Sequence, residues 1–360
     1  MLAISNHGYL LGGGEYSFLD LLPSLSQNWH VLAVLPEEGE LATRLKQKGI
    51  EPQIIPLPSI RPWNVFNILA SLRTYSNLCH RYRPVLIYAN GSRAALYGGI
   101  VGRILKLPVI WHCRIADTDI LLDSILARLS SRVIANSRAT ASRFGRCSQS
   151  KLRVIYNGVN LDWLIKVPLD PPNNFNNENK IILSVARVSR EKRHDLLISA
   201  FERVANSNPK AHLICIGSKD PADPGWWDYL QTLTRRSPFS NRIQWLGFCS
   251  DVRPWYRNAF MFVLGTANEA FGRVLVEAMA CGVPVVAMRS GAIPEIVRHG
   301  QDGLLVTGGA DEMASAMSKI LENENLRRHL SRSAKERAKS FSLSAHVEQI
   351  TNVFNEMVRT

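Results

Sequence analysis

The chain has 360 residues, a formal net charge of +13 and an apolar content of 46%. This length exceeds one compact core and suits two domains of about 150 to 180 residues each. No apolar run approaches the roughly 20 residues needed to cross a bilayer, and the first eight residues are too short and uncharged for a signal peptide. The composition predicts a soluble, cytoplasmic protein of two domains.

The positive charge is concentrated in one stretch of the chain. From Arg61 to Arg153, fifteen Lys and Arg stand against three acids, whereas the first 60 residues hold three against six. Such a basic surface attracts an anionic partner, which could be nucleic acid, a phospholipid headgroup or a lipid diphosphate. A merely solvated basic face explains the same pattern. Nothing in the sequence resembles an RNA-binding motif, so we expect no nucleic acid partner.

The six cysteines give no sign of a metal or redox site. None of them forms a C-x-x-C pair, which argues against both a zinc ribbon and a dithiol motif. Lone cysteines are often buried in cores. We therefore expect free core thiols and no metal.

Short β-rich runs alternate with helical segments through the first half. The expected strands are Leu2–Ser5, His30–Leu35, Pro52–Leu57, Pro84–Asn90, Pro108–His112, Arg132–Asn136 and Arg153–Asn157. Helical composition is found between them, as in Leu41–Lys48 and Val65–Cys79. This βαβα pattern predicts a parallel, doubly wound sheet.

A stretch rich in Pro and Asn interrupts this alternation, and we predict a linker at 166–179. The alternation then resumes. The expected strands of the second half are Lys180–Ala186, Ala211–Gly217, Arg242–Gly247, Phe260–Gly265, Val283–Ala287 and Gly303–Val306. The predicted organisation is a domain at 1–165, the linker, a second domain at 180–342 and a C-terminal helix within 343–360. Ligands of such sheets bind beyond the carboxyl ends of the strands, so we expect the two sheets to face a shared cleft.

The most informative stretch contains Glu269 and Glu277, with Gly272 between them. Gly272 frees backbone N–H groups at the start of a predicted helix, and Glu277 lies about one turn into that helix. A helix N-terminus favours phosphate, while carboxylates accept hydrogen bonds from sugar hydroxyls. This arrangement predicts binding of a ligand that carries both groups, such as a nucleotide sugar.

This stretch resembles the signature of the family 4 retaining glycosyltransferases, and other landmarks agree with it in order. They are Gly12-Gly13-Gly14-Glu15, His112, Asn136-Ser137, Asn157-Gly158-Val159, Arg187 with Lys192, and Trp245-Leu246-Gly247-Phe248. The resemblance covers nearly the whole chain. It implies the GT-B fold, with two Rossmann-like domains, an acceptor-side first domain, a nucleotide-sugar-binding second domain, and a C-terminal helix that crosses back. Leu343–Val358 is the candidate for that helix.

The resemblance implies roles for the second-domain residues. Arg187 and Lys192 would hold the donor diphosphate, and fixed cations suit a departing diphosphate on physical grounds also. Glu269 would face the sugar and Glu277 the ribose hydroxyls. The segment Phe271, Gly272, Arg273 and Val274 would contribute to donor binding, chiefly through amides facing the diphosphate.

Two positions depart from the family pattern. His194 stands where the family usually has glycine, which affects the local loop shape. Thr266 replaces a serine hydroxyl ahead of Glu269, and we expect binding to survive this change.

In the first domain, the resemblance places Gly12 and Gly13 beside the donor and acceptor. It places His112 near the transferred sugar, where it would assist catalysis through hydrogen bonding. The triplet Asp117-Thr118-Asp119 admits two interpretations. A D-x-D triplet marks the metal site of a different class of glycosyltransferases, but here it precedes a predicted helix, where acids cap the N-terminus. We favour the cap.

The predicted function is retaining, metal-independent transfer of a hexose to a hydroxyl of a glycan or lipid-linked acceptor. The donor would be a UDP-, GDP- or ADP-sugar, and no cofactor is expected. The resemblance implies front-face displacement, and polysaccharide biosynthesis is the expected role. The basic stretch from Arg61 to Arg153 adds the hypothesis of a peripheral location at the inner membrane face. The alternatives are a nucleotide-sugar 2-epimerase of the same fold, a glycan phosphorylase, and a non-catalytic protein that binds anionic ligands. Base, sugar and acceptor stay open.

Overall fold

The computed structural model describes residues 1–145, 150–166, 175 and 178–358. The chain forms two compact units. The first consists of Met1–Gly158 and the C-terminal segment that begins at Leu343, and the second is Val159–Ser342. The division therefore falls before residue 165, the predicted end of the first domain. The predicted linker at 166–179 lies mostly outside the described residues.

The first unit contains a seven-stranded sheet in the order β3-β2-β1-β4-β5-β6-β7 among the described residues, and every pairing is parallel. β-Branched and other apolar side chains occupy both faces of its central strands, as expected for a sheet covered on both sides. The strands are β1 (Leu2–Ser5), β2 (Leu32–Leu35), β3 (Gln53–Ile54), β4 (Ile87–Asn90), β5 (Val109–Cys113), β6 (Arg132–Ala135) and β7 (Leu152–Val154).

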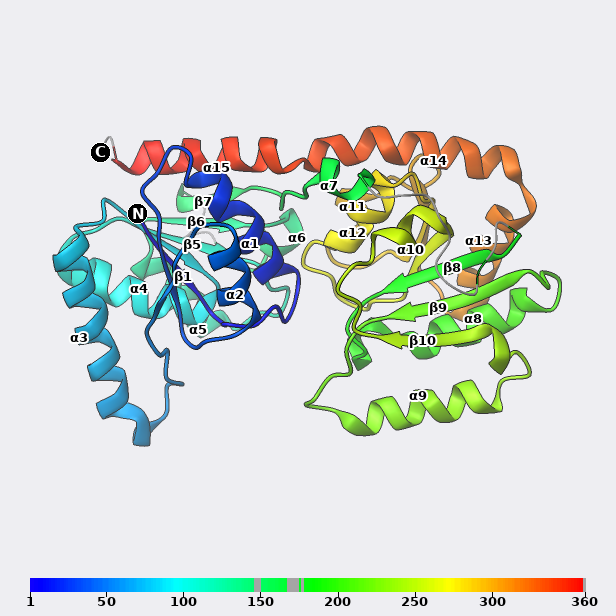
Figure 1. Cartoon of the computed structure of the whole chain (residues 1–360), viewed down its shortest axis with the longest axis horizontal. Helices are drawn as coiled ribbons and strands as arrows, with labels where there is room; N and C mark the ends of the chain where they lie inside the picture. The colour runs from blue at the N-terminus through cyan, green and yellow to red at the C-terminus, as the bar shows by residue number, and fades with distance from the viewer. Residues whose placement is uncertain (146–149, 167–174, 176–177, 359–360) are drawn as a thin grey trace. The chain divides into compact units, whose positions relative to one another are not determined.

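Helices cover both faces of this sheet. The helices are α1 (Gly13–Leu25), α2 (Glu40–Gln47), α3 (Val65–Tyr82), α4 (Ser92–Leu105), α5 (Ile120–Leu129), α6 (Arg138–Ala141) and α15 (Leu343–Val358), with a 3₁₀ turn at Pro62–Asn64. One apolar core lies under α1, α2 and α15, and a second lies under α3, α4 and α5. Helix α15 contacts α1 and buries Ile350, Val353 and Phe354, so it is an integral part of this unit (Figure 1).

The second unit contains a six-stranded sheet in the order β10-β9-β8-β11-β12-β13 among the described residues, again with parallel pairing throughout. The strands are β8 (Lys180–Val185), β9 (Ala211–Ile216), β10 (Ile243–Gly247), β11 (Ala259–Leu264), β12 (Val285–Met288) and β13 (Gly303–Val306). Where the chain enters and leaves this unit, Val159 and Ser342 form a parallel bridge.

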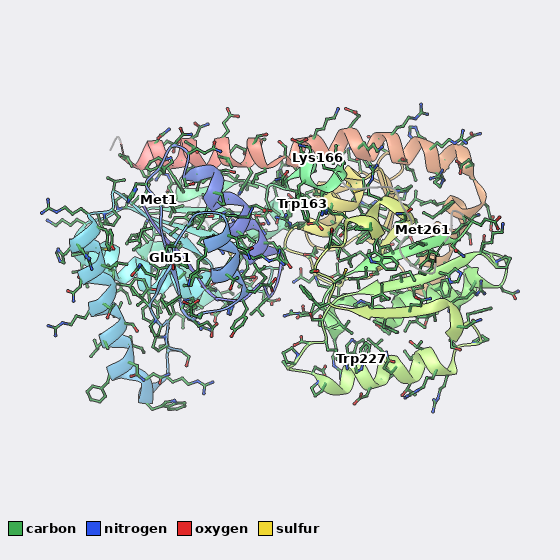
Figure 2. The ribbon with its side chains drawn as sticks, in the orientation of Figure 1. Met1, Glu51, Trp163, Lys166, Trp227 and Met261 are labelled. Atoms are coloured by element: carbon green, nitrogen blue, oxygen red, sulfur yellow. The ribbon has the colours of Figure 1, made fainter. Side chains whose placement is uncertain are left out.

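Helices cover this second sheet as well. They are α7 (Leu161–Ile165), α8 (His194–Ala205), α9 (Pro224–Arg236), α10 (Arg253–Asn258), α11 (Arg273–Ala280), α12 (Ile293–Ile296), α13 (Ala310–Glu322) and α14 (Glu324–Ala338). Figure 2 shows Trp227 on the side of α9 that faces the sheet. Its ring packs edge-on against that of Trp245, with the centroids 5.3 Å apart. Trp227 and Trp245 are therefore packing residues.

The strand orders determine where ligands can bind. In the first sheet, strands are added in one direction from β1 to β3 and in the other direction from β4 onward. The second sheet has the same order, with β8 and β11 in the places of β1 and β4. A crevice forms beyond the carboxyl ends of strands at such a switch point. The loops after β1, β4, β8 and β11 are therefore the ones to inspect.

The predicted fold class is confirmed: both halves are doubly wound parallel α/β sheets. The largest differences lie in the edge strands. The predicted strand Pro52–Leu57 is reduced to the two residues of β3, and β7 ends at Val154 rather than at Asn157. Edge strands pair on one side only, so sequence pattern defines their ends poorly. No helix within the described residues is both long and apolar enough to span a membrane.

Candidate functional site

The loop between β11 and α11 is shaped by Gly272. Its φ of +85° is left-handed, and a Cβ there would lie 2.8 Å from Leu275 Cδ1 and 3.3 Å from Glu269 Cγ. Glycine alone fits both constraints without strain. Gly272 is also the N-cap of α11 and offers no side-chain acceptor to the first amides of the helix. The helix therefore starts with N–H groups and a partial positive charge suited to an anion.

Lys192 and Glu269 form an ion pair across the switch point. Lys192 follows β8 and Glu269 follows β11, and Lys192 Nζ donates to Glu269 Oε2 at 2.8 Å. The two side chains are only 19% and 15% exposed. The backbone joins the same loops, because the Ala267 amide donates to the Glu191 carbonyl at 2.9 Å. The loop carrying the lysine is thus fixed against the loop carrying the acid.

A second ion pair lies within α11. Arg273 Nε donates to Glu277 Oε1 at 2.8 Å, and the Tyr256 hydroxyl donates to Glu277 Oε2 at 3.0 Å. Burial raises the pKa of Tyr256 well above 10, and the negative charge of Glu277 raises it further. The phenol therefore remains a donor that fixes the carboxylate. Sequence reasoning missed Tyr256, since its position 21 residues before Glu277 carries no motif.

Arg187 is the least constrained of the predicted donor residues. It follows β8, its side chain is 45% exposed, and its Nε lies 3.8 Å from Asp220 Oδ2. Close to it, Gly217 has a φ of +154°, and a Cβ there would collide with the Ala186 carbonyl oxygen. The ends of β8 and β9 therefore approach closely beside Arg187, whose side chain stays partly in solvent.

The backbone of the Lys192 loop differs from the sequence expectation. The left-handed residue is Arg193, with a φ of +49°, rather than the neighbouring His194. His194 begins α8 and is buried, with its ring centroid 5.4 Å from that of Trp245. Burial lowers its pKa to about 4, and neither ring nitrogen has a hydrogen-bond partner within the described part of the chain. His194 is thus a neutral core residue.

Three further residues named from the sequence, Phe271, Val274 and Thr266, contribute packing or backbone structure to this region. Phe271 is buried with its ring centroid 5.9 Å from that of Phe341, so its side chain packs and only its main chain could meet a ligand. Val274 lies in the first turn of α11 and is half-buried. Thr266 is wholly buried and donates to the Asn268 carbonyl at 3.2 Å, so its hydroxyl shapes the loop before Glu269.

In the first unit, the glycine turn opens α1 after β1. Gly12 is the N-cap without a side-chain acceptor, Gly13 is the first helical residue, and both are exposed. The neighbouring switch-point loop is also shaped by a glycine. Gly91 has a φ of +108° and packs against the Asn6 side chain, whose Oδ1 accepts from the Ala94 amide at 2.8 Å. Two helix starts, those of α1 and α4, thus lie at one edge of the sheet.

His112 lies on β5 and is fully buried. The Tyr88 hydroxyl contacts its Nδ1 at 2.6 Å and itself accepts from Arg114 Nη2 at 3.2 Å. The phenol proton is therefore directed at Nδ1, which makes Nε2 the protonated nitrogen. Burial lowers the pKa of His112 well below 6.5, and the nearby Arg114 and His346 lower it further. His112 is a neutral donor, and contact with a ligand requires a neighbouring side chain to move.

Arg114 is the centre of this cluster, and sequence reasoning did not assign it a role. Its Nε donates to Asn90 Oδ1 at 2.6 Å and its Nη1 donates to Asn157 Oδ1. A Cβ on Gly14 would lie 3.5 Å from Arg114 Cδ, so the glycine turn also packs on this side chain. The cluster thus connects the ends of β1, β4 and β5. Its signal in the sequence is polar residues at several strand ends, which requires knowing the strand order.

Helix α15 completes the same cluster. His346 Nδ1 donates to the Tyr156 carbonyl at 2.7 Å, and its ring centroid lies 5.9 Å from that of His112. Phe354 contacts the Tyr88 ring, with centroids 5.5 Å apart. The environment of His112 therefore depends on residues more than 230 positions later in the chain, counting from His112 to His346.

The D-x-D triplet has a local role in the structure. Asp119 Oδ1 accepts from the Leu122 amide at 3.0 Å and so caps α5. Within the described ranges no three His, Cys, Asp or Glu residues gather as metal ligands would.

The structure thus gathers the predicted residues into two groups. Lys192, Glu269 and Gly272 meet in the second unit, with Arg273 and Glu277 on the helix that follows. In the first unit, Arg114 connects the glycine turn to the strand of His112. That the two groups face one cleft stays a prediction.

Comparison with known proteins assigns both units. Residues 11–163 match the family Glycosyltransferase Family 4, and residues 168–337 match the family Glycosyl transferases group 1. An uncharacterized glycosyltransferase of Methanocaldococcus jannaschii is 29% identical over 197 residues, covering 52% of this chain and 49% of that protein. D-inositol 3-phosphate glycosyltransferase of Corynebacterium glutamicum is 31% identical over 190 residues, covering 50% and 44%. The chain spans about half the length of these relatives.

Solved structures share the fold over the whole chain. HepE of Anabaena in complex with UDP has a TM-score of 0.86 and 24% identity, covering 99% of both chains. HepE has also been solved with UDP and glucose and with UDP-glucose. With most of both units matched in sequence by these two family models, the chain belongs to the glycosyltransferases that they describe.

Proposed function

We propose that this protein is an enzyme that transfers a hexose from a nucleoside diphosphate sugar to a hydroxyl group. Two ion pairs near the start of α11 carry this proposal. Lys192, from the loop after β8, pairs with Glu269, and Arg273 pairs with Glu277 within α11. They combine cations for a diphosphate with carboxylates for sugar hydroxyls, beside a helix N-terminus that has no side-chain cap.

Donor binding would proceed by exchange of partners. The diphosphate oxygens take the place of the Glu269 carboxylate on Lys192, and the exposed Arg187 adds a second cation. The amides of Gly272, Arg273 and Val274 complete the phosphate site. Glu269 is then free to accept hydrogen bonds from the sugar, and Glu277 from the ribose. Exchange of one charged partner for another avoids leaving a half-buried lysine unpaired.

The proposed chemistry is retaining and metal-independent. Lys192 and Arg187 stabilise the charge that develops on the departing diphosphate, which is the main electrostatic demand of the reaction. The diphosphate takes the acceptor proton on the face from which it leaves, so the new bond forms with retention. His112 supplies a neutral N–H rather than a proton, consistent with its lowered pKa. If activity is lost on chelation with EDTA and restored by Mg²⁺, the metal-independent part of the proposal is wrong.

UDP-glucose is the first donor to test, because HepE, which shares the fold, binds it. Calorimetry with UDP and with UMP isolates the contribution of the second phosphate, and UDP-glucose against UDP isolates that of the sugar. We expect Lys192→Ala to reduce kcat/KM by about a hundredfold or more, since an electrostatic contact to the leaving group is removed. Lys210→Ala is the matched control, because Lys210 forms a fully surface ion pair with Glu178; it should be unchanged.

Turnover assays with labelled UDP-glucose, with and without an acceptor, separate the alternatives. A nucleotide-sugar 2-epimerase would convert labelled UDP-glucose to its epimer without an acceptor. A non-catalytic binding protein would bind the nucleotide and show no turnover with any acceptor. Equal turnover by Lys192→Ala and wild type would contradict the assignment of the site.

We further propose a glycan or lipid-linked acceptor, as in polysaccharide biosynthesis, reached at an anionic membrane surface. The support is the basic stretch 61–153 of the first unit. Co-sedimentation with vesicles tests this electrostatic part. Equal binding to vesicles with and without acidic lipid would remove it.

A further inference from the structure

The segment that leads into α3, together with the first turns of that helix, exposes large apolar side chains that have no place in either core of their unit. Phe66 is 84% exposed and Trp63 is 71% exposed. We define the apolar tip as these two residues with three neighbours of the same kind. It consists of Ile60, Trp63, Val65, Phe66 and Leu69. Water contact with so much apolar surface is unfavourable, and contiguous patches of this type mark interaction sites.

The apolar side chains that α3 contributes to the tip share one face, because Val65, Phe66 and Leu69 fall within an arc of about 100° at 3.6 residues per turn. Of residues 65–70, only Ile68 is half-buried, and burial against the sheet begins at Ser71. The start of α3 extends past the other helices of its unit in Figure 1. A helix with one exposed apolar face beside cationic side chains suits a position at the boundary of a bilayer.

The charges around the tip favour an anionic surface. The segment 52–116 contains eight Lys and Arg and no Asp or Glu. Arg73 is exposed one turn beyond Leu69, and the Arg61 guanidinium lies over the Trp63 ring at 5.4 Å from its centroid. Long cationic side chains next to aromatic rings suit the boundary between headgroups and acyl chains.

The position of the tip suits the proposed reaction. Helix α3 follows β3, so the tip lies at the carboxyl edge of the sheet, the edge that carries Gly12, Gly13 and the end of β5. Ile120 and Leu121, 77% and 74% exposed, begin α5 at this edge as well. Docking by this edge would bring the acceptor side of the first unit to the bilayer surface.

We infer that the apolar tip inserts into the interface of an anionic bilayer and anchors the first unit there. This inference extends the membrane part of the proposed function and adds a hydrophobic anchor to the electrostatic attraction. It does not depend on the identity of the donor.

The test is flotation of the full chain with vesicles of phosphatidylcholine, alone or mixed with phosphatidylglycerol. Wild type should float with the mixed vesicles. Trp63→Ser with Phe66→Ser should lower the partition coefficient by about a hundredfold, because two buried aromatic side chains are lost. Ile104→Ser is the matched control, because Ile104 is 67% exposed but lies at the C-terminal end of α4, away from the tip. Its partition coefficient should stay close to that of wild type.

A charge variant separates the two contributions. Arg61→Gln with Arg73→Gln should weaken binding to mixed vesicles by about tenfold or more and leave binding to pure phosphatidylcholine unchanged. All substituted positions are exposed, so folding should be preserved, and calorimetry with UDP-glucose in the absence of vesicles checks the donor site. Donor binding that is absent in wild type, with flotation intact, would reject the proposed function and leave the anchor standing.

Three results would overturn the anchor. The first is a wild type that stays out of both kinds of vesicle, and the second is a tip variant that floats as well as wild type. The third is a dimer in sedimentation velocity that Phe66→Ser dissociates, which would assign the tip to self-association.

Discussion

The two units arrange polar groups at the carboxyl edges of their sheets in different ways. In the second unit the groups are ion pairs that are partly exposed, Lys192 with Glu269 and Arg273 with Glu277. In the first unit Arg114, Tyr88 and His112 form a buried network that runs through amide, phenol and imidazole groups. Partly exposed ion pairs can change partners when an anion arrives, whereas a buried network fixes geometry. The second unit is therefore built for exchange and the first for positioning.

The largest effect is expected at the loop that holds the exchangeable pairs. Gly272→Ala should destabilise the protein by about 3 kcal/mol, from left-handed strain plus crowding against Leu275. Gly300→Ala is the matched control, because Gly300 has a φ of +76° with open space around it. It should cost about 1 to 2 kcal/mol, the strain alone. Urea unfolding measures both, and equal losses would show that crowding contributes nothing.

A pH effect on stability is expected from His194, which adjoins the exchangeable lysine. Its pKa is lowered to about 4 in the folded chain, so the unfolded chain binds the proton more tightly. The contribution of His194 to the free energy of unfolding is therefore fully present above its unfolded pKa of about 6.5. This contribution is lost as the pH falls towards 4. The loss between pH 7 and pH 5 should be about 2 kcal/mol for this residue.

Urea unfolding of His194→Leu at pH 7 and pH 5 tests this expectation. The variant should lose about 2 kcal/mol less than wild type over this interval. His329→Leu, at an exposed position, should retain the wild-type difference. An unchanged slope in His194→Leu would mean that its imidazole is not the group that titrates.

Two tyrosines allow the comparison between the units to be made with the same substitution. Tyr256→Phe removes a donor to Glu277, and Tyr88→Phe removes the link between Arg114 and His112. Each loss should be worth about tenfold, as expected for hydrogen bonds involving charged groups. We expect Tyr256→Phe to raise KM for the donor and Tyr88→Phe to lower kcat. If both variants change the same constant, the division into exchange and positioning is wrong.

The smallest effect concerns Arg193. Its left-handed backbone is unfavourable for any residue with a Cβ, so Arg193→Gly should stabilise the protein by up to about 1 kcal/mol. The partly exposed ion pair with Asp195 would be lost at little cost. Thermal unfolding with Arg190→Gly as a control, at a residue with ordinary backbone, checks the sign.

The sequence was sufficient to predict the fold and to bring together the group of residues in the second unit, for physical reasons. Alternating apolar strands and helices imply a parallel sheet, and Glu269, Gly272 and Glu277 lie close together in the chain. The group in the first unit was predictable only in part, because Tyr88, Arg114 and His346 are brought together by strand order and by α15. The full burial of His112 and the left-handed Arg193 depend on tertiary packing, which overrides local preference.

The place of α15 in the first unit has a consequence for synthesis. The core of that unit takes Ile350, Val353 and Phe354 from beyond the second unit in the chain. Domains tend to fold as units while the chain emerges, and the second unit is one continuous segment. During translation the second unit can therefore close first, and the sheet that begins with residue 2 must wait with an uncovered face until α15 appears. Agents that bind exposed apolar surface in nascent chains should recognise the first unit for longer than the second.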